Sequence, residues 1–282
     1  MPRCKRALFK IGVYPIIDHY YEPQFDIRES KRLFSQERPL PGIDWNIDEQ
    51  LRLLGDLTFS NEVADMPTKQ SAERRFYLNN GSFESGDAEF WYQIIRLKKP
   101  KRIFEIGSGN STLMALQAIQ MNRAEDPHYA CEHVCIEPYE ASWLEQTSAS
   151  IIRSKVEDLD VAFFSALEEN DILFIDSSHI IRPQGDVVYE FLELLPTLRK
   201  GVIVHIHDIF SPRNYLKRWL MDEVKFWNEQ YLLEAFLSHN SGWKVIASLN
   251  YLHHRYFDEL RAVAPFLTRE REPGSFYLQR VA

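Results

Sequence analysis

The chain has 282 residues and a formal net charge of −8 at pH 7, with 45% hydrophobic and 26% charged residues. This is the composition of a globular protein with enough apolar material for a sizeable core. The negative charge argues against a nucleic acid as the main partner, because phosphates require a basic surface. No apolar run approaches the ~20 residues that cross a bilayer, and the first residues lack the apolar segment of a secretory signal. With three cysteines that lack metal-binding spacing (Cys4, Cys131 and Cys135), we expect a cytoplasmic protein without a membrane partner.

The first 87 residues are rich in aromatic residues, proline and asparagine, as in YPIIDHYYEPQF and FYLNNGSFESGD. They lack the alternation of helix and strand patterns seen later in the chain. We therefore expect an irregular N-terminal cap over residues 1–87 and a catalytic domain over residues 88–282.

From residue 88 onward, helical and strand-like segments alternate. Apolar periodicity predicts helices over residues 88–99, 110–123, 140–149, 186–200 and 216–238. Short apolar runs predict strands over residues 102–107, 133–138, 150–156, 171–176, 201–210, 243–249 and 274–281. Such βαβ units predict an α/β fold with a doubly wound, mostly parallel sheet that helices cover on both faces. Asn110 or Ser111 is expected to cap the second helix.

Acidic residues stand at the carboxyl ends of the first five strands, in the segments EIGSG, IEP, VED, IDSSH and HIHD. Ligands of open parallel sheets bind at this edge, near the point where the strand order reverses. The sequence therefore predicts a site built from these five strand ends.

The first strand runs into a turn made of Gly107, Ser108 and Gly109, which is followed by a helix. Such a turn brings backbone N–H groups and a helix N-terminus close to a ligand. A dinucleotide site would carry glycine where Thr112 stands, and Glu105 inside the strand is out of place beside a pyrophosphate. An acid at this position suits a ligand with a positive amine and a sulfonium.

Two later strand ends complete the pattern of a nucleoside site. Glu137 ends the second strand, where a carboxylate can accept hydrogen bonds from both hydroxyls of a ribose. Glu157, or its neighbour Asp158, follows the third strand, where a side chain can meet an adenine edge.

These segments resemble the class I S-adenosylmethionine-dependent methyltransferases. EIGSGNS is similar to their E/D-x-G-x-G-x-G turn, with Ser111 at the third glycine, and CIEP resembles their second-strand acid. GSFYLQRV resembles their antiparallel seventh strand, and the resemblance covers residues 88–210 together with this last strand. It implies a Rossmann-like, seven-stranded, mostly parallel sheet with an antiparallel last strand, and S-adenosylmethionine as cofactor. In many such enzymes an N-terminal segment folds over the cofactor.

The resemblance also implies roles for single residues. Glu105 would face the methionine amine, and Gly107, Ser108 and Gly109 would line the methionine moiety. Glu137 would hold the ribose. A contact between Asp176 and the edge of the cofactor stays an open alternative.

The chemistry is expected where the fourth and fifth strands end. Asp176 ends the fourth strand, His179 lies three residues on, and His207 with Asp208 ends the fifth. Methyl transfer requires an oriented acceptor and a nucleophile stripped of its proton. His179, with an ordinary pKa near neutrality, is our candidate base beside the catalytic acids Asp176 and Asp208. The D-x-x-H spacing of Asp176 and His179 is similar to that of macrolide-sugar O-methyltransferases, in which the histidine is the proposed base.

A divalent cation is the alternative device, because a metal lowers the pKa of a coordinated hydroxyl. Magnesium-dependent small-molecule O-methyltransferases carry an aspartate at the end of the fourth strand and an Asp-Asp or Asp-Asn pair at the end of the fifth. Here the ligands would be Asp176, His207 and Asp208. An imidazole suits manganese, iron or zinc better than magnesium.

Several alternatives stay open at this point. A nicotinamide-dependent oxidoreductase, a non-heme iron enzyme similar to the cephalosporin-hydroxylase-like proteins, and a non-catalytic scaffold compete with O-methylation of a sugar or secondary metabolite. The aromatic row 226–231 is expected in the core, at a homo-oligomer surface or against the substrate. His205 is expected to be a core histidine, and His253 with His254 a solvated pair. Asp186 is expected to start a helix.

Overall fold

The computed structural model describes residues 7–8, 10–16, 23–24, 26–70 and 75–282. These residues form two compact units. The smaller unit combines the described residues up to Gln36 with Asn214–Phe226, and it contains the 3₁₀ helix η1 (Ile27–Glu29) and the short helix α7 (Lys217–Met221). The larger unit, Glu37–Arg213 with Trp227–Ala282, holds the sheet and every candidate site residue named above.

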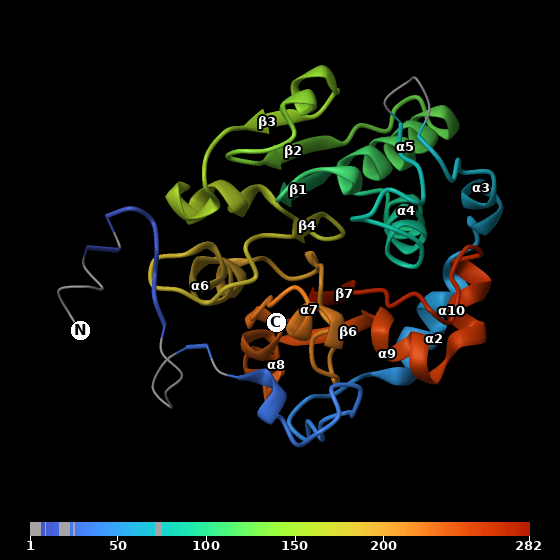
Figure 1. Cartoon of the computed structure of the whole chain (residues 1–282). Helices are drawn as coiled ribbons and strands as arrows, with labels where there is room; N and C mark the ends of the chain where they lie inside the picture. The colour runs from blue at the N-terminus through green and yellow to red at the C-terminus, as the bar shows by residue number, and fades with distance from the viewer. Residues whose placement is uncertain (1–6, 9, 17–22, 25, 71–74) are drawn as a thin grey trace. The chain divides into compact units, whose positions relative to one another are not determined.

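The larger unit is built on a seven-stranded sheet with the order β3-β2-β1-β4-β5-β7-β6 (Figure 1). The neighbouring pairs among β1 to β5 are parallel, and β7 runs antiparallel between β5 and β6. This confirms the predicted fold class. The strands are β1 (Arg102–Ile106), β2 (Glu132–Ile136), β3 (Ser150–Ile152), β4 (Ile172–Ile175), β5 (Ile203–Ile206), β6 (Trp243–Ser248) and β7 (Phe276–Arg280).

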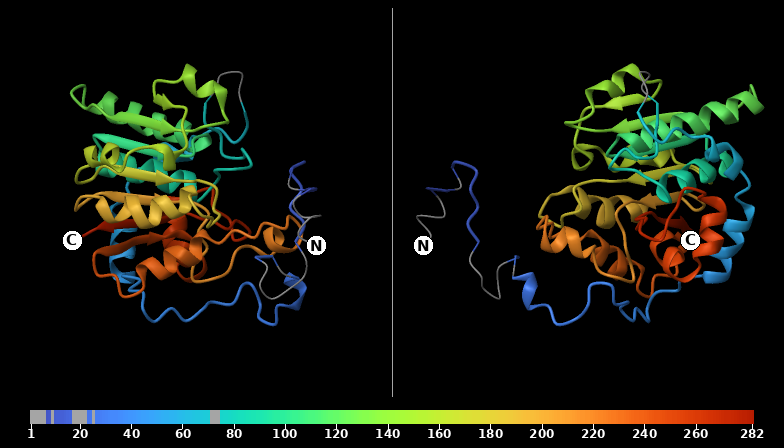
Figure 2. Two further views of the ribbon diagram at one scale, coloured as in Figure 1. Left: turned by 90° about the vertical axis from the view of Figure 1, so that its left-hand side faces the viewer. Right: turned by 45° about the vertical axis from the view of Figure 1, so that its right-hand side comes forward.

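Helices cover both faces of this sheet, as the continuous apolar strands require (Figure 2). Alternate residues of β4 enter different cores. Phe174 packs in the cluster that includes side chains of α4 (Asp87–Lys98) and α5 (Asn110–Glu125). Leu173 packs in the second cluster, with side chains of the helical segment 186–197 and of α8 (Glu229–Leu237).

The segment predicted as one helix over residues 186–200 changes its winding twice. It consists of α6 (Asp186–Tyr189), the π-helical turn η5 (Glu190–Leu194) and the 3₁₀ turn η6 (Leu195–Thr197). Pro196 lies in the last turn, where it supplies no N–H donor and its ring disfavours a regular helix before it. Asp186 is the first residue of α6, as predicted.

The prediction of one continuous helix over residues 216–238 is wrong, because the segment contains two separate helices, α7 and α8. The N–H groups of Asn228 and Glu229 donate to the backbone oxygen of His179 instead of continuing a helix from α7. The segment 140–149 forms only the 3₁₀ helix η2 (Ser142–Gln146). Neither Asn110 nor Ser111 is the cap of α5, because helix winding begins at Asn110 and Gly109 precedes it.

The N-terminal residues are less irregular than predicted, since they contain α2 (Ile47–Asp56) and α3 (Ser60–Ala64). The boundary at residue 87 stays a prediction. The remaining elements are η3 (Val156–Asp158), η4 (Val161–Ala166), α9 (Leu249–Arg255) and α10 (Phe257–Val263). Cys131 and Cys135 are buried and unpaired with each other, as packing residues should be, while Cys4 lies outside the described residues. Within the described ranges, no helix combines the length and apolar character needed to cross a bilayer.

Candidate active site

The glycine turn lies against the end of β4. Gly107 has φ +75°, and a Cβ at this position would overlap the backbone oxygen of Asp176. A Cβ on Gly109 would instead meet no atom within 4 Å. Gly107 is therefore required by close backbone packing, whereas Gly109 leaves an open space at the start of α5, where a ligand can approach.

Glu105 lies beneath this turn and is fully buried. Its carboxylate accepts hydrogen bonds from the hydroxyls of Ser111 and Thr112, and it lies 2.9 Å from Nε2 of His133. The Thr112 hydroxyl in turn accepts the N–H of Gly109 at 3.1 Å. Glu105 thus holds the first turn of α5 in place, and its expected role toward a methionine amine stays a prediction.

Glu137 lies beside the turn at the end of β2. One carboxylate oxygen accepts the N–H groups of Tyr139 and Glu140, at 2.8 and 2.9 Å. The other makes only a long contact of 3.5 Å with the N–H of Ser108. The Ser108 hydroxyl is buried and has no hydrogen-bond partner among the described residues. These two polar groups leave hydrogen-bonding capacity for a ligand at the turn.

A cluster of two histidines and two aspartates lies at the ends of β4 and β5. Nε2 of His179 lies 3.3 Å from Asp176 and 3.7 Å from Asp208. Nδ1 of His207 lies 3.4 Å from Asp176 and 3.6 Å from Asp208. The structure therefore brings together all four residues that were predicted to share a pocket. Candidate metal-ligating atoms of Asp176, His179 and Asp208 lie within 4.8 Å of one another, so His179 competes with His207 as a third ligand.

Two of these residues have unusual backbone conformations. His179 and Asp208 both have φ +60°, in the left-handed region that non-glycine residues seldom adopt. Each such residue costs on the order of 1–3 kcal/mol and persists where the surroundings enforce it. In this conformation His179 lies 3.3 Å from Asp176, and Asp208 lies 3.7 Å from His179 and 3.6 Å from His207.

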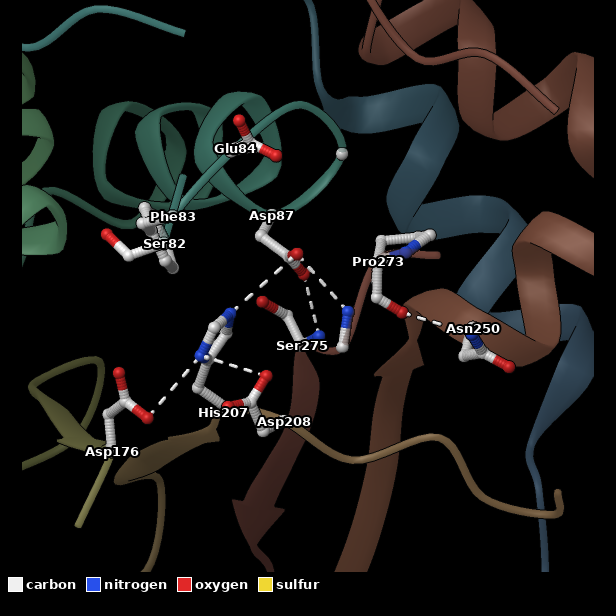
Figure 3. A network of polar contacts seen from close by, with 12 residues as sticks. Ser82, Phe83, Glu84, Asp87, Asp176, His207, Asp208, Asn250, Pro273 and Ser275 are labelled. Atoms are coloured by element: carbon white, nitrogen blue, oxygen red, sulfur yellow. Dashed lines mark hydrogen bonds and ion pairs between the residues drawn. The ribbon is translucent and has the colours of Figure 1, made fainter. Parts of the chain in front are cut away.

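Two acids that were not predicted from the sequence contact the histidines. Each lies beside the ring nitrogen that does not face Asp176 and Asp208. Oε2 of Glu229 lies 2.8 Å from Nδ1 of His179. The carboxylate of Asp87 lies 3.7 Å from Nε2 of His207 and accepts the N–H groups of Gly274 and Ser275 (Figure 3). In Figure 3 the His207 ring lies between Asp87 on one side and Asp176 with Asp208 on the other.

The charged groups of this cluster, together with burial, shift the pKa values of its members. Burial disfavours the imidazolium form of both histidines, but the carboxylates outweigh burial. Hydrogen bonds to Asp176 and Glu229 raise the pKa of His179 well above its usual value. The charges of Asp208 and Asp176 do the same for the pKa of His207. Burial raises the pKa of Asp208, whereas the pKa of Asp176 is lowered because the two histidines outweigh its desolvation.

Three further histidines, for which the sequence made predictions, lie outside this cluster. His205 is fully buried, bonds Ser275 at 2.8 Å and stacks on Tyr277, and burial lowers its pKa well below the usual value. It is the core residue that the sequence predicted. His254 is partly exposed and pairs with Glu272, but His253 is only 3% exposed, so the prediction of a solvated pair is wrong for His253.

The segment before α4 reaches the site from the N-terminal side. Phe83 is buried, with its ring 5.1 Å from that of His207. The hydroxyl of Ser82 accepts the side-chain amide N–H of Asn110 at 2.9 Å. These contacts link the segment to both the glycine turn and the histidine cluster. Glu157 lies in η3, partly exposed, and its expected contact with an adenine edge stays a prediction.

Comparison with known proteins gives three findings. Residues 104–209 match the model of a family described as "Methyltransferase domain". An uncharacterized protein of Archaeoglobus fulgidus is 33% identical over 167 residues, which cover 55% of this chain and 74% of the relative. The solved O-methyltransferase from Bacillus cereus, in complex with SAH, aligns with a TM-score of 0.38 and 15% identity, over 83% of this chain and 91% of that one. The family match spans the glycine turn and the ends of β1, β2, β4 and β5.

Proposed function

Because the chain belongs to the class I S-adenosylmethionine-dependent methyltransferases, we propose that it methylates a hydroxyl oxygen of a small molecule, with His179 as the base. The observation that carries the proposal is the position of His179. Its Nε2 is directed at the carboxylates that end β4 and β5, and the backbone of Asp176 contacts the glycine turn.

The residues around the turn fit the cofactor. Gly109 leaves open space, the Ser108 hydroxyl lacks a partner among the described residues, and one oxygen of Glu137 is nearly free. We assign the methionine part to Gly107, Ser108 and Gly109, and the ribose to Glu137. When bound, S-adenosylmethionine supplies an electrophilic methyl group whose transfer leaves a neutral thioether.

In its neutral form, with the ring proton on Nδ1, His179 would accept the proton of the acceptor hydroxyl at Nε2; because the pKa of His179 is raised, this form requires a pH above that raised value. General bases of this kind contribute about 10²–10⁴-fold to a rate when they lie within hydrogen-bonding distance of the proton. In our proposal Asp176 and Asp208 orient the acceptor and stabilise the positive charge that His179 gains. The Trp227 ring, 4.2 Å from that of His179, covers one side of the base.

We further propose that Asp176, His207 and Asp208 bind a divalent cation. Among the described residues, the ion-pair partners of both carboxylates are histidines, so no lysine or arginine neutralises them there. Two aspartates with an imidazole suit manganese, iron or zinc. Such an ion would lower the pKa of a coordinated hydroxyl.

The charge of the site favours a neutral or cationic acceptor, such as a sugar or a phenolic secondary metabolite. Four carboxylates, those of Asp87, Asp176, Asp208 and Glu229, outnumber the two histidines, so before a cation binds an anionic acceptor would be repelled. A homo-oligomer and a cytoplasmic location stay predictions.

The test is transfer of a radiolabelled methyl group from S-adenosylmethionine to a panel of monosaccharides, glycosides, phenols and catechols, with and without Mn²⁺. We expect labelled product for at least one neutral hydroxyl compound, and none with His179→Ala. Label found only on amines would contradict the assignment to oxygen. Substrate oxidation that needs iron, or hydride transfer from a nicotinamide, would instead support the oxidoreductases considered from the sequence.

A further inference from the structure

The start of α8 is joined to the loop that follows β4. The N–H groups of Asn228 and Glu229 donate to the backbone oxygen of His179, at 3.0 and 3.2 Å. The side-chain oxygen of Asn228 accepts the N–H of Ile181 at 2.6 Å. These bonds connect positions about 50 residues apart in sequence and hold the His179 backbone in its left-handed conformation.

The same helix turn also holds the His179 side chain. Oε2 of Glu229 lies 2.8 Å from Nδ1, and the Trp227 ring lies 4.2 Å from the imidazole. Glu229 is fully buried, and His179 is its ion-pair partner among the described residues. An ionised carboxylate accepts hydrogen bonds and does not donate them, so with Glu229 ionised Nδ1 carries the proton in this contact.

This contact determines which nitrogen faces the site. With its proton on Nδ1 bonded to Glu229, His179 presents Nε2 to Asp176 and Asp208. A carboxylate that orients a histidine through its second nitrogen is a general device of enzymes that use histidine as a base.

We propose that Glu229 is a positioning residue, which holds the Nδ1 proton of His179 and keeps Nε2 directed at the acceptor site. The inference rests on the proposed role of His179 as base. Glu229 acts through the histidine and touches neither acceptor nor cofactor in this account. Trp227 completes the support by packing against the face of the ring.

A spectroscopic test does not depend on the acceptor. A buried Nδ1–H bonded to a carboxylate gives a proton resonance downfield of the amides, which His179→Gln will identify by its loss. We expect Glu229→Ala to remove this resonance. Glu229→Gln should move the resonance toward the amides or remove it, because an amide oxygen is a weaker acceptor and an amide N–H can donate to Nδ1 in the other tautomer. The His133–Glu105 pair, 2.9 Å apart, supplies a resonance that should not change in either variant.

The matched control is Glu234→Gln, on the same helix. Glu234 is also buried, but it bonds Arg38 and the Ser211 hydroxyl instead of His179. This control should retain the His179 resonance. With the acceptor found in the methyl-transfer screen, Glu229→Ala should lower kcat about 100-fold. Glu229→Gln should lower kcat as well, because an amide N–H that donates to Nδ1 would place the ring proton on Nε2.

Three results would overturn the inference. They are survival of the His179 resonance in Glu229→Ala, an unshifted resonance in Glu229→Gln, or an unchanged kcat in Glu229→Ala. If Glu229→Ala does not fold, the change of the His179 resonance in Glu229→Gln tests the inference on its own. Failure of the wild-type protein to bind S-adenosylmethionine or transfer methyl would count against the proposed function, and the resonances would still show whether Glu229 positions His179.

Discussion

The backbone oxygen of Asp176 occupies the space that a side chain at Gly107 would need. We therefore expect Gly107→Ala to lower the free energy of unfolding by about 2–4 kcal/mol, because the positive φ and the backbone overlap both penalise a Cβ. Urea unfolding measures this change.

Gly109→Ala is the matched variant, since a Cβ there meets open space. It should change the free energy of unfolding by less than about 1 kcal/mol. Its methyl group should weaken binding of S-adenosylmethionine, because it would stand in the space assigned to the cofactor. Equal effects of both substitutions on stability would contradict this distinction.

His179→Ala should abolish most of the activity without removing the cofactor. Loss of a general base lowers kcat by about 100-fold or more, whereas the Kd for S-adenosylmethionine should change by less than about twofold. Steady-state kinetics and calorimetric titration of the same preparation separate the two effects. The control is His254→Ala, at the partly exposed histidine that pairs with Glu272. A His179→Ala variant with the kcat of the wild type would show that His179 is not the base.

Asp208→Asn should weaken binding of Mn²⁺ by at least about tenfold, because it replaces an anionic ligand with a neutral one. His207→Ala should do the same if His207, and not His179, is the third ligand. Electron paramagnetic resonance of free Mn²⁺ measures the binding. Asp258→Asn, at an aspartate whose side chain is 90% exposed, is the control. Identical Mn²⁺ affinity in wild type and Asp208→Asn would exclude the proposed cation site.

We expect His133 to make the stability of the fold depend on pH. Burial opposes protonation of its ring, but Cys135 and Glu105 raise its pKa from 6.5 to about 10. A raised folded-state pKa stabilises the fold fully below pH 6.5, and this contribution is lost as the pH rises toward 10. The free energy of unfolding should fall by up to about 1.4 kcal/mol per pH unit across this interval. Urea unfolding at a series of pH values should show a shallower slope for His133→Gln, and an unchanged slope would contradict the assignment.

The sheet could be predicted from the sequence because its signals are local. Runs such as IFEI and ILFI are buried on both faces, and the glycine turn follows β1 directly. The helices were harder to predict, because a contact distant in sequence decided one boundary. Nothing between residues 216 and 238 shows that the His179 backbone oxygen would accept the N–H groups that start α8.

The candidate site also contains residues that could be predicted from the sequence and residues that could not. Asp176, His179, His207 and Asp208 follow strand ends, so the topology alone brings them together. Asp87 and Glu229 come from helix starts far away in the chain, where an acid is expected for helix stability alone. The signal available for Glu229 was an acid inside the aromatic row 226–231, a segment whose apolar character indicates burial. An acid in such a segment requires a buried partner.

Calorimetric titration with S-adenosylmethionine, on wild type, Glu137→Ala and Glu140→Ala, tests whether Glu137 and the glycine turn form the cofactor site. We expect micromolar binding to wild type and to Glu140→Ala, because the Glu140 side chain is exposed and the variant keeps the N–H that bonds Glu137. Glu137→Ala should bind at least about tenfold more weakly, because the ribose hydroxyls lose their acceptor. Absence of binding to the wild-type protein, or equal binding to all three, would contradict the proposed cofactor site.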